Sequence, residues 1–353
     1  KTLAHSLRHH RDAGGAFSQY FAIALQQYAV ARRIQRLAFG GRADAIDVLD
    51  FACGYGRLLR FLVLALPPGR IVASELQPDA LDFVAATFGV QALPSCADPD
   101  RFRAGRRFDF IWVASLFSHL PEALFHGWLR TLLALLAPHG VLCFSVRDAD
   151  LLPAGEELPP SGIRYDRRSE NAGLGADIYG TTWAGEAFVR RALREAGGRD
   201  PAVQRLPRAL ANEQDLYVVA ADAGADLSAL RAFRRGPWGW VDRRELSPSG
   251  ELCLQGWAAS LDDGAVEQVE IEVDGARYRC ATGLARADVG AAFADARLAH
   301  SGWTFRCQVD PATPAPRVEV GARSARGETA LLYAGRVRTP PAAAARGDGP
   351  SGT

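Results

Sequence analysis

The segment Asp50-Phe51-Ala52-Cys53-Gly54-Tyr55-Gly56 has the composition of a ligand-binding turn. It ends the short apolar run of residues 46–51 and precedes residues 57–66, whose apolar spacing predicts a helix. Gly54 and Gly56 allow the backbone to turn sharply and to approach a ligand closely. The carboxylate of Asp50 can face a cationic amino group. The segment therefore predicts a binding loop for a ligand that carries such a group.

A nicotinamide dinucleotide fits this turn poorly. Its fingerprint, G-x-G-x-x-G, would fall on Ala52, Gly54 and Arg57, so that only the middle glycine is present. This turn would also offer no good binding site for a pyrophosphate. The other alternative is a plain tight turn between a strand and a helix, and a lone G-x-G would favour that alternative.

Three polar residues that follow later predicted strands favour a ligand. Glu75 ends the second strand, where a carboxylate can accept hydrogen bonds from both hydroxyls of a ribose; alternatively it is a surface residue that starts a loop. Asp98 follows the third strand and can either bond an adenine amino group or cap a turn. Ser115 lies just past the fourth strand, at the same edge of the predicted sheet.

One histidine is placed to act as a base at this edge. His119, in Ser118-His119-Leu120-Pro121, follows the fourth predicted strand, and imidazole titrates in a range that suits proton transfer. The alternative is a histidine that orders the start of the next helix. Asp177 and Tyr179 are secondary candidates.

These residues require elements that bring the ends of several strands together. Residues 1–45 have helical apolar spacing, and residues 46–221 alternate apolar strands with amphipathic helices. This rhythm predicts an α/β fold, a doubly wound parallel sheet with helices on both faces, whose ligands bind at the carboxyl ends of the strands. The strands are predicted at 46–51, 71–75, 91–94, 108–114, 141–146, 203–206 and 216–221, and the helices at 57–66, 79–88, 121–136 and 182–195.

The remainder of the chain has a different organisation. Residues 147–180 are rich in Pro, Gly and charge and are long enough to form a functional loop or lid. Residues 222–245 are predicted to be a linker, and residues 246–338 a smaller all-β sandwich because short β-rich runs alternate there with turn signals. The tail, residues 339–353, is predicted to be disordered.

Composition excludes several classes of function. The chain has 41 basic and 40 acidic residues and a net charge of +1, which provides no field to attract nucleic acid. Its six cysteines form no C-x-x-C pair, so we expect no metal site and a reducing, cytoplasmic location. We expect neither a signal peptide nor a membrane-spanning segment, because no apolar run reaches that length.

The ordered motifs VLDFACGYGR, IVASELQPDAL, FDFIWVASLFSHLPE and LLALLAPHGVLCFSV resemble those of class I S-adenosylmethionine-dependent methyltransferases, in particular the bacterial group with a VLDxGCGxGR motif. The resemblance implies a Rossmann-like sheet of seven strands whose last strand is antiparallel. It also implies S-adenosyl-L-methionine as the cofactor. Ala52 stands where that motif has glycine, and Glu75 where aspartate is commoner.

The resemblance assigns roles to individual residues. Asp50, Ala52 and Gly54 line the methionine part of the cofactor, Glu75 the ribose, Asp98 the adenine and Ser115 the wall beside the sulfonium. Cys53, Gly56 and Leu76 complete the expected cofactor-binding set, and His119 is the catalytic candidate. Residues 246–338 are similar to β-sandwich modules appended to bacterial glycan-synthesis proteins, through GWAASLDDG, the Asp274-Gly275 turn, RADV at 286–289 and SGW at 301–303.

Three functions are therefore considered. The first is an enzyme that methylates a small-molecule or glycan acceptor, at a hydroxyl, with a possible protein partner for the sandwich. The second is a non-catalytic binding or scaffold protein with a degenerate methyltransferase fold; the intact Asp50, Gly54, Gly56 and Glu75 argue against it. The third, a nucleic-acid methyltransferase, is disfavoured by the neutral charge and by residues 114–117, ASLF, where an N-P-P-Y-like motif would stand.

Overall fold

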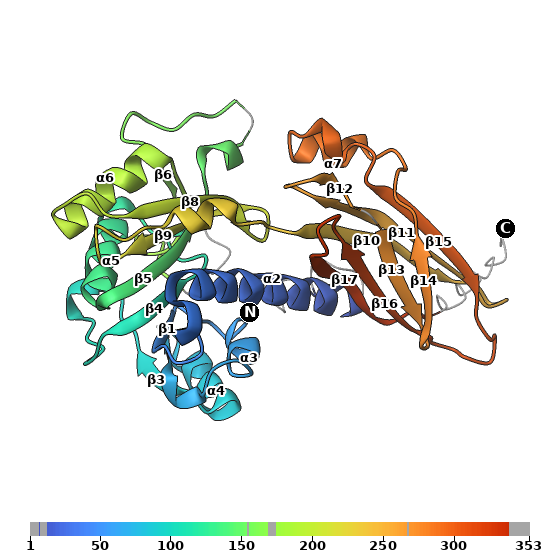
Figure 1. Ribbon diagram of the computed structural model, residues 1–353, viewed down its shortest axis with the longest axis horizontal. Helices are drawn as coiled ribbons and strands as arrows, with labels where there is room; N and C mark the ends of the chain where they lie inside the picture. The colour runs from blue at the N-terminus through green and yellow to red at the C-terminus, as the bar shows by residue number, and fades with distance from the viewer. Residues whose placement is uncertain (1–6, 8–12, 154, 169–173, 267, 339–353) are drawn as a thin grey trace, which may run out of the picture. The chain divides into compact units, whose positions relative to one another are not determined.

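The computed structural model describes residues 7, 13–153, 155–168, 174–266 and 268–338 (Figure 1). The chain forms two compact units. The first comprises residues 23–235, and the second comprises residues 236–338 together with residues 13–22 of the first long helix, α2 (Ala13–Phe39). The predicted disordered tail lies outside the described residues.

The first unit is built on one sheet of seven strands. They are β1 (Val48–Phe51), β2 (Ile71–Glu75), β3 (Gln91–Pro94), β4 (Phe108–Val113), β5 (Leu136–Val146), β8 (Val203–Leu210) and β9 (Gln214–Ala220). The strand order is β3-β2-β1-β4-β5-β9-β8, and β9 runs antiparallel to both of its neighbours. The prediction of a doubly wound, seven-stranded Rossmann-like sheet is confirmed.

Helices cover both faces of this sheet (Figure 1). One face packs against α2, α3 (Leu59–Leu62) and α4 (Pro78–Phe88), and the other against α5 (Glu122–Ala134) and α6 (Glu186–Gly197). Successive strand side chains point to opposite faces, so Val48 belongs to the first core and Leu49 to the second. This explains why the strands are apolar throughout rather than alternating.

Some predicted boundaries are wrong. The helix predicted over 57–66 is reduced to α3, because Leu64 and Ala65 donate to carbonyls three residues back before Pro67. The helix predicted over 121–136 ends at Ala134. The segment Pro138-His139-Gly140 does not terminate it but lies inside β5.

The start of the helix predicted over 182–195 is also wrong. Residues 181–184 form β7 (Thr181–Ala184), which pairs with β6 (Ile163–Asp166), and α6 begins at Glu186. β-branched and aromatic residues favour a strand here, and the backbone N–H of Thr182 donates to the carbonyl of Ser118.

The second unit contains two antiparallel sheets around a shared apolar core. One sheet contains β10 (Pro237–Leu246), β11 (Glu251–Ser260), β12 (Gly264–Ala265) and β15 (Gly302–Gln308). The other contains β14 (Ala276–Cys280), β13 (Gln268–Val273), β16 (Arg317–Arg323) and β17 (Thr329–Arg336). A short helix, α7 (Ala287–Ala292), was not predicted.

Strand β10 begins within residues 222–245, the segment predicted to be a linker. The reason is close pairing with β11: a Cβ on Gly239 would lie 2.3 Å from the carbonyl oxygen of Trp257.

Trp303 is buried in the shared core, and Trp257 is half-buried against Phe293. The remaining helical elements are single 3-10 turns, at Gly40–Arg42, Pro68–Arg70, Pro99–Arg101, Ala149–Leu151, Ser228–Ala232 and Ala296–Leu298.

The described residues contain neither a membrane-spanning helix nor a cluster of metal ligands. No described helix is both long enough and apolar enough to cross a membrane. The described histidine, cysteine and acidic side chains form no group of three or more that could hold a metal ion.

Candidate active site at the carboxyl edge of the sheet

The turn after β1 needs unusual backbone conformations at three positions. Ala52, Gly54 and Gly56 have φ values of 55°, 54° and 70°, in the left-handed region. A Cβ on Gly56 would lie 2.5 Å from Cε2 of Phe88, so this glycine allows the turn to pack against α4. At Gly54 the same Cβ position has no atom of the described residues within 4 Å. The two glycines therefore have different roles, and only Gly54 faces open space.

Glu75 joins the end of β2 to this turn. Its Oε2 accepts a hydrogen bond of 2.8 Å from the backbone N–H of Gly54. Its Oε1 accepts bonds of 2.8 and 3.1 Å from the N–H groups of Leu76 and Gln77, just before α4. The carboxylate is therefore held in place by three backbone donors, at the edge where the sequence predicts it.

Asp50 is a buried carboxylate on β1, between β2 and β4. Only 3% of its surface is exposed, and among the described residues no donor contacts its buried Oδ2. Burial and, to a smaller extent, the charge of Glu75 raise the pKa of Asp50 to about 8. A cationic group beside Asp50 would reverse this shift, because it favours the ionised form. The thiol of neighbouring Cys53 also has a raised pKa, chiefly because of burial.

Asp98 is exposed and caps a turn. Its Oδ1 accepts a bond of 2.9 Å from the N–H of Asp100, in the 3-10 turn that follows β3. The sequence predicts two alternative roles for Asp98, a turn cap and an adenine contact, and this hydrogen bond is that of a turn cap. The structure shows no contact between Asp98 and Asp50, Gly54 or Glu75, so the adenine contact stays a prediction.

Ser115 belongs to a polar cluster at the ends of β4, β5 and β9. Its φ is 57°, and its N–H donates to Oγ of Ser145 at 2.8 Å. Gln214 completes the cluster: its Nε2 donates to Oγ of Ser115 at 3.0 Å, and its Oε1 accepts from Oγ of Ser145 at 2.7 Å. The sequence analysis missed Ser145 and Gln214. The signal was the antiparallel last strand, whose first residues lie at the same edge as the carboxyl ends of the parallel strands.

His119 is buried and tied to the insert between β5 and α6. Its ring stacks on Tyr179 with centroids 4.4 Å apart, and its Nδ1 lies 2.6 Å from the carbonyl oxygen of Gly180. A carbonyl oxygen only accepts, so Nδ1 is the donor in this contact. Gly180 returns a bond from its N–H to the carbonyl of His119. Asp177, the other secondary candidate, is exposed and pairs with Arg167.

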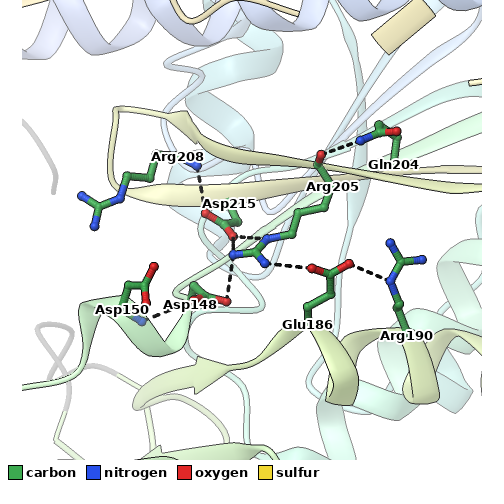
Figure 2. A network of polar contacts seen from close by, with 8 residues as sticks. All are labelled: Asp148, Asp150, Glu186, Arg190, Gln204, Arg205, Arg208 and Asp215. Carbon is green, nitrogen blue, oxygen red and sulfur yellow. Dashed lines mark hydrogen bonds and ion pairs between the residues drawn. The ribbon is translucent and has the colours of Figure 1, made fainter. Parts of the chain in front are cut away.

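An ion-pair network braces the strands beside this edge (Figure 2). Arg205 of β8 contacts Asp215 of β9 at 2.5 Å, Asp148 after β5 at 3.2 Å and Glu186 of α6 at 2.8 Å. Asp215 is 2% exposed and also accepts the N–H of Arg208. One guanidinium therefore connects four segments around the strands that carry Ser145 and Gln214. The sequence analysis missed this network as well.

Comparison with known proteins identifies the first unit. The profile of the methyltransferase-domain family matches residues 22–229, more than half of the chain. The chain belongs to this methyltransferase family. The family match names no methyl donor, so S-adenosyl-L-methionine as the cofactor stays a prediction. The profile ends before the second unit, so the resemblance of residues 246–338 to glycan-synthesis modules stays a prediction.

Solved structures similar to this methyltransferase cover a little more than half of its chain. An amino pentose methyltransferase from Micromonospora echinaspora is 20% identical, with a TM-score of 0.41, over 56% of this chain and 90% of that one. A sugar N-methyltransferase from a Streptoalloteichus species is 20% identical, with a TM-score of 0.41, over 55% and 85%. DesVI from Streptomyces venezuelae is 17% identical, with a TM-score of 0.40, over 58% and 93%. No curated protein matches the chain.

The methyltransferase thus brings most predicted site residues to one edge. Asp50, Gly54 and Glu75 lie together around the turn after β1, while Ser115 and His119 follow the adjacent strand β4. Cys53 directly precedes Gly54 in this turn, and the N–H of Leu76 donates to the Glu75 carboxylate. The structure does not place Asp98 or Asp177 in contact with any of these residues. The arrangement can hold a cationic nucleoside and place a basic nitrogen on the neighbouring strand end.

Proposed function

We propose that this methyltransferase transfers a methyl group from S-adenosyl-L-methionine to a hydroxyl of a small-molecule or glycan acceptor. The observation that supports the site most directly is the buried Oδ2 of Asp50, which no described donor contacts. It lies on the strand that leads into Gly54, where the Cβ position is open. An unpaired buried acceptor beside open backbone fits a ligand that carries an ammonium group.

The residues present fit the cofactor. Asp50 would pair with its amino group, Glu75 would accept its ribose hydroxyls and Ser115 would form the wall near its sulfonium. With its three backbone bonds in place, Glu75 has one of its roughly four acceptor sites left, on Oε2, so it can take one ribose hydroxyl, and a bond to the second hydroxyl would replace a backbone bond. When bound, the cofactor supplies a methyl group on a good leaving group. Positioning can therefore provide most of the acceleration.

In this proposal His119 is the general base. Its Nδ1–H is directed to the carbonyl of Gly180, which holds the tautomer whose Nε2 can accept a proton from an acceptor hydroxyl. The stacked ring of Tyr179 holds the plane of the imidazole. Both contacts come from the insert, so this segment positions the proposed base.

The first test of the proposal is binding. Titration calorimetry with S-adenosylhomocysteine should give one site per chain. Incubation with methyl-labelled S-adenosylmethionine and a panel of free sugars and nucleotide sugars should then transfer label to a hydroxylated acceptor. A protein that shows no heat with the cofactor product would instead be a scaffold with a degenerate fold.

Cofactor affinity is expected to rise with pH. The pKa of Asp50 is about 8, so its carboxyl group is mostly protonated in the ligand-free protein at neutral pH. Pairing with an ammonium lowers this pKa, so binding below about pH 8 releases a proton and weakens as the pH falls. Between about pH 5.5 and pH 7.5 we expect up to about tenfold tighter binding of S-adenosylhomocysteine per pH unit.

Calorimetry in buffers of different ionisation enthalpy would measure the released proton directly. Asp50→Asn, which keeps the shape but cannot ionise, should bind more weakly and without this pH dependence. A wild-type affinity that is flat across the range would show that Asp50 does not pair with the cofactor.

His119→Asn separates the base from the fold. The asparagine amide can still donate to the carbonyl of Gly180, but it has no basic nitrogen. We expect turnover of the labelled acceptor to fall by about 100- to 10,000-fold, with the dissociation constant of S-adenosylhomocysteine unchanged. If the variant retains full turnover, His119 only orders the start of α5, the alternative that the sequence left open.

A further inference from the structure

We propose that Gln214 is a positioning residue for the cofactor: it holds Ser115 in its left-handed conformation and orients the Ser115 hydroxyl at the carboxyl edge of the sheet. The inference deepens the proposed function and rests on it. Gln214 itself need not touch the cofactor, because it acts through Ser115.

The backbone of Ser115 needs external support. A serine at a φ of 57° is strained, since its Cβ crowds the following carbonyl. Such a conformation persists only where the surroundings determine it. Here the support is the bond from the Ser115 N–H to Oγ of Ser145, which lies inside β5. The turn after β4 is thereby fixed to the next strand of the sheet.

Gln214 closes this contact into a ring. Its Oε1 accepts the proton of Ser145 Oγ, which leaves the lone pairs of that oxygen directed toward the Ser115 N–H. Its Nε2 donates to Oγ of Ser115 at 3.0 Å, and its Oε1 lies 3.2 Å from the same atom. The carboxamide therefore determines where the Ser115 oxygen lies and which directions remain for its proton. Gln214 is 8% exposed, which protects the ring from competing water.

The hairpin that carries Gln214 is itself held firmly. On one side, Asp215 bonds Arg205 and the N–H of Arg208 (Figure 2). On the other, the side chain of Gln26 in α2 accepts the N–H of Ala211 in the turn before β9. Because the start of β9 is held on both sides, the carboxamide of Gln214 can hold Ser115 in place without moving itself.

Strain is concentrated around this edge. In the described part of the first unit, the non-glycine residues with left-handed backbones all follow β1 or β4 or lie in the β8–β9 hairpin: Ala52, Ser115, Arg208, Ala211 and Asn212. Strained conformations gather where a site must be preorganised. Their distribution links the hairpin to the turns at Ala52 and Ser115.

The test is a double-mutant cycle read by calorimetric binding of S-adenosylhomocysteine. Gln214→Met keeps the side-chain volume and removes the side-chain hydrogen bonds to Ser115 and Ser145. We expect the dissociation constant of S-adenosylhomocysteine to rise about tenfold. Ser115→Gly adopts the left-handed backbone without strain and has no hydroxyl to orient. In the Ser115→Gly background, Gln214→Met should therefore change affinity by less than about twofold, because glycine has no hydroxyl to orient and keeps the left-handed backbone without support from Ser145.

Two further variants keep the result interpretable. Ser145→Ala is a small change that opens the same ring, and it should weaken binding even if Gln214→Met fails to fold. Gln204→Met is the matched control on β8, where Nε2 of Gln204 donates to the carbonyl of Arg205 (Figure 2); its affinity should equal that of the wild type.

The outcomes are distinguishable. Wild-type protein that does not bind S-adenosylhomocysteine would overturn the proposed function, and this inference with it. Wild-type protein that binds, while Gln214→Met and Ser145→Ala bind equally well, overturns only the role of Gln214. An equal loss from Gln214→Met in the serine and glycine backgrounds would show a general packing role and would also overturn the inference.

Discussion

A valine at position 54 is expected to abolish binding of S-adenosylhomocysteine without unfolding the sheet. The Cβ of residue 54 points into open space beside Asp50 and Glu75, so a larger side chain would occupy volume that the cofactor needs. The left-handed φ of 54° adds a backbone penalty of about 1–2 kcal/mol. Calorimetry measures the affinity, and thermal unfolding followed by circular dichroism measures the stability.

Two controls separate ligand exclusion from backbone strain. Gly54→Ala has the same backbone penalty but little added volume, so it should retain part of the binding. Gly56→Val should behave in the opposite way to Gly54→Val, because its side chain would press on Phe88 and lower stability by about 1–3 kcal/mol. Unchanged affinity in Gly54→Val would remove the cofactor from this turn.

Arg205→Ala is expected to destabilise the first unit by about 3–5 kcal/mol. The substitution leaves Asp215 and Asp148, both buried, without the guanidinium that contacts them. Urea unfolding followed by circular dichroism would measure the loss. The difference from wild type should shrink as the pH falls, since burial already raises the pKa of Asp215 and its protonation removes the uncompensated charge.

The same network supplies the control. Arg190 pairs with Glu186 at the surface, with 42% of its side chain exposed, so Arg190→Ala should cost only about 0–1 kcal/mol. An Arg205→Ala variant within about 1 kcal/mol of wild type would show that the network is solvated in solution and braces nothing.

Local patterns predicted the parts of the site that depend on neighbours in sequence. A short apolar strand that contains Asp50 and is followed by two glycines defines the turn, and Glu75 is placed because it ends the adjacent parallel strand. Both follow from strand order and require no knowledge of register. The same reasoning placed Ser115 and His119 at the edge, because each follows the end of β4.

The residues that were missed depend on pairings across long separations. Gln214 reaches Ser115 only because β9 runs antiparallel, and Arg205 meets Asp215 beside a register shift in β8. Thr182 lies in a strand because Ser118 and Arg147 provide partners for residues 182–184. The β6–β7 pairing also explains Gly180. A Cβ at this position would lie 2.2 Å from the carbonyl oxygen of Asp166. The resemblance implied the antiparallel direction of the last strand, but the sequence carries no signal for the register of these pairings.

The reversed direction of β9 also constrains the order in which the protein can be assembled during synthesis. Ser115 and Gln214 are 99 residues apart, and Gln26 and Ala211 are 185 residues apart. A nascent chain that has emerged only through α6 holds the turn after β1 and the end of β4 but has nothing to close the ring around Ser115. Cofactor affinity on the ribosome should therefore appear late, once β9 has emerged, and the contacts of the edge must form across most of the unit.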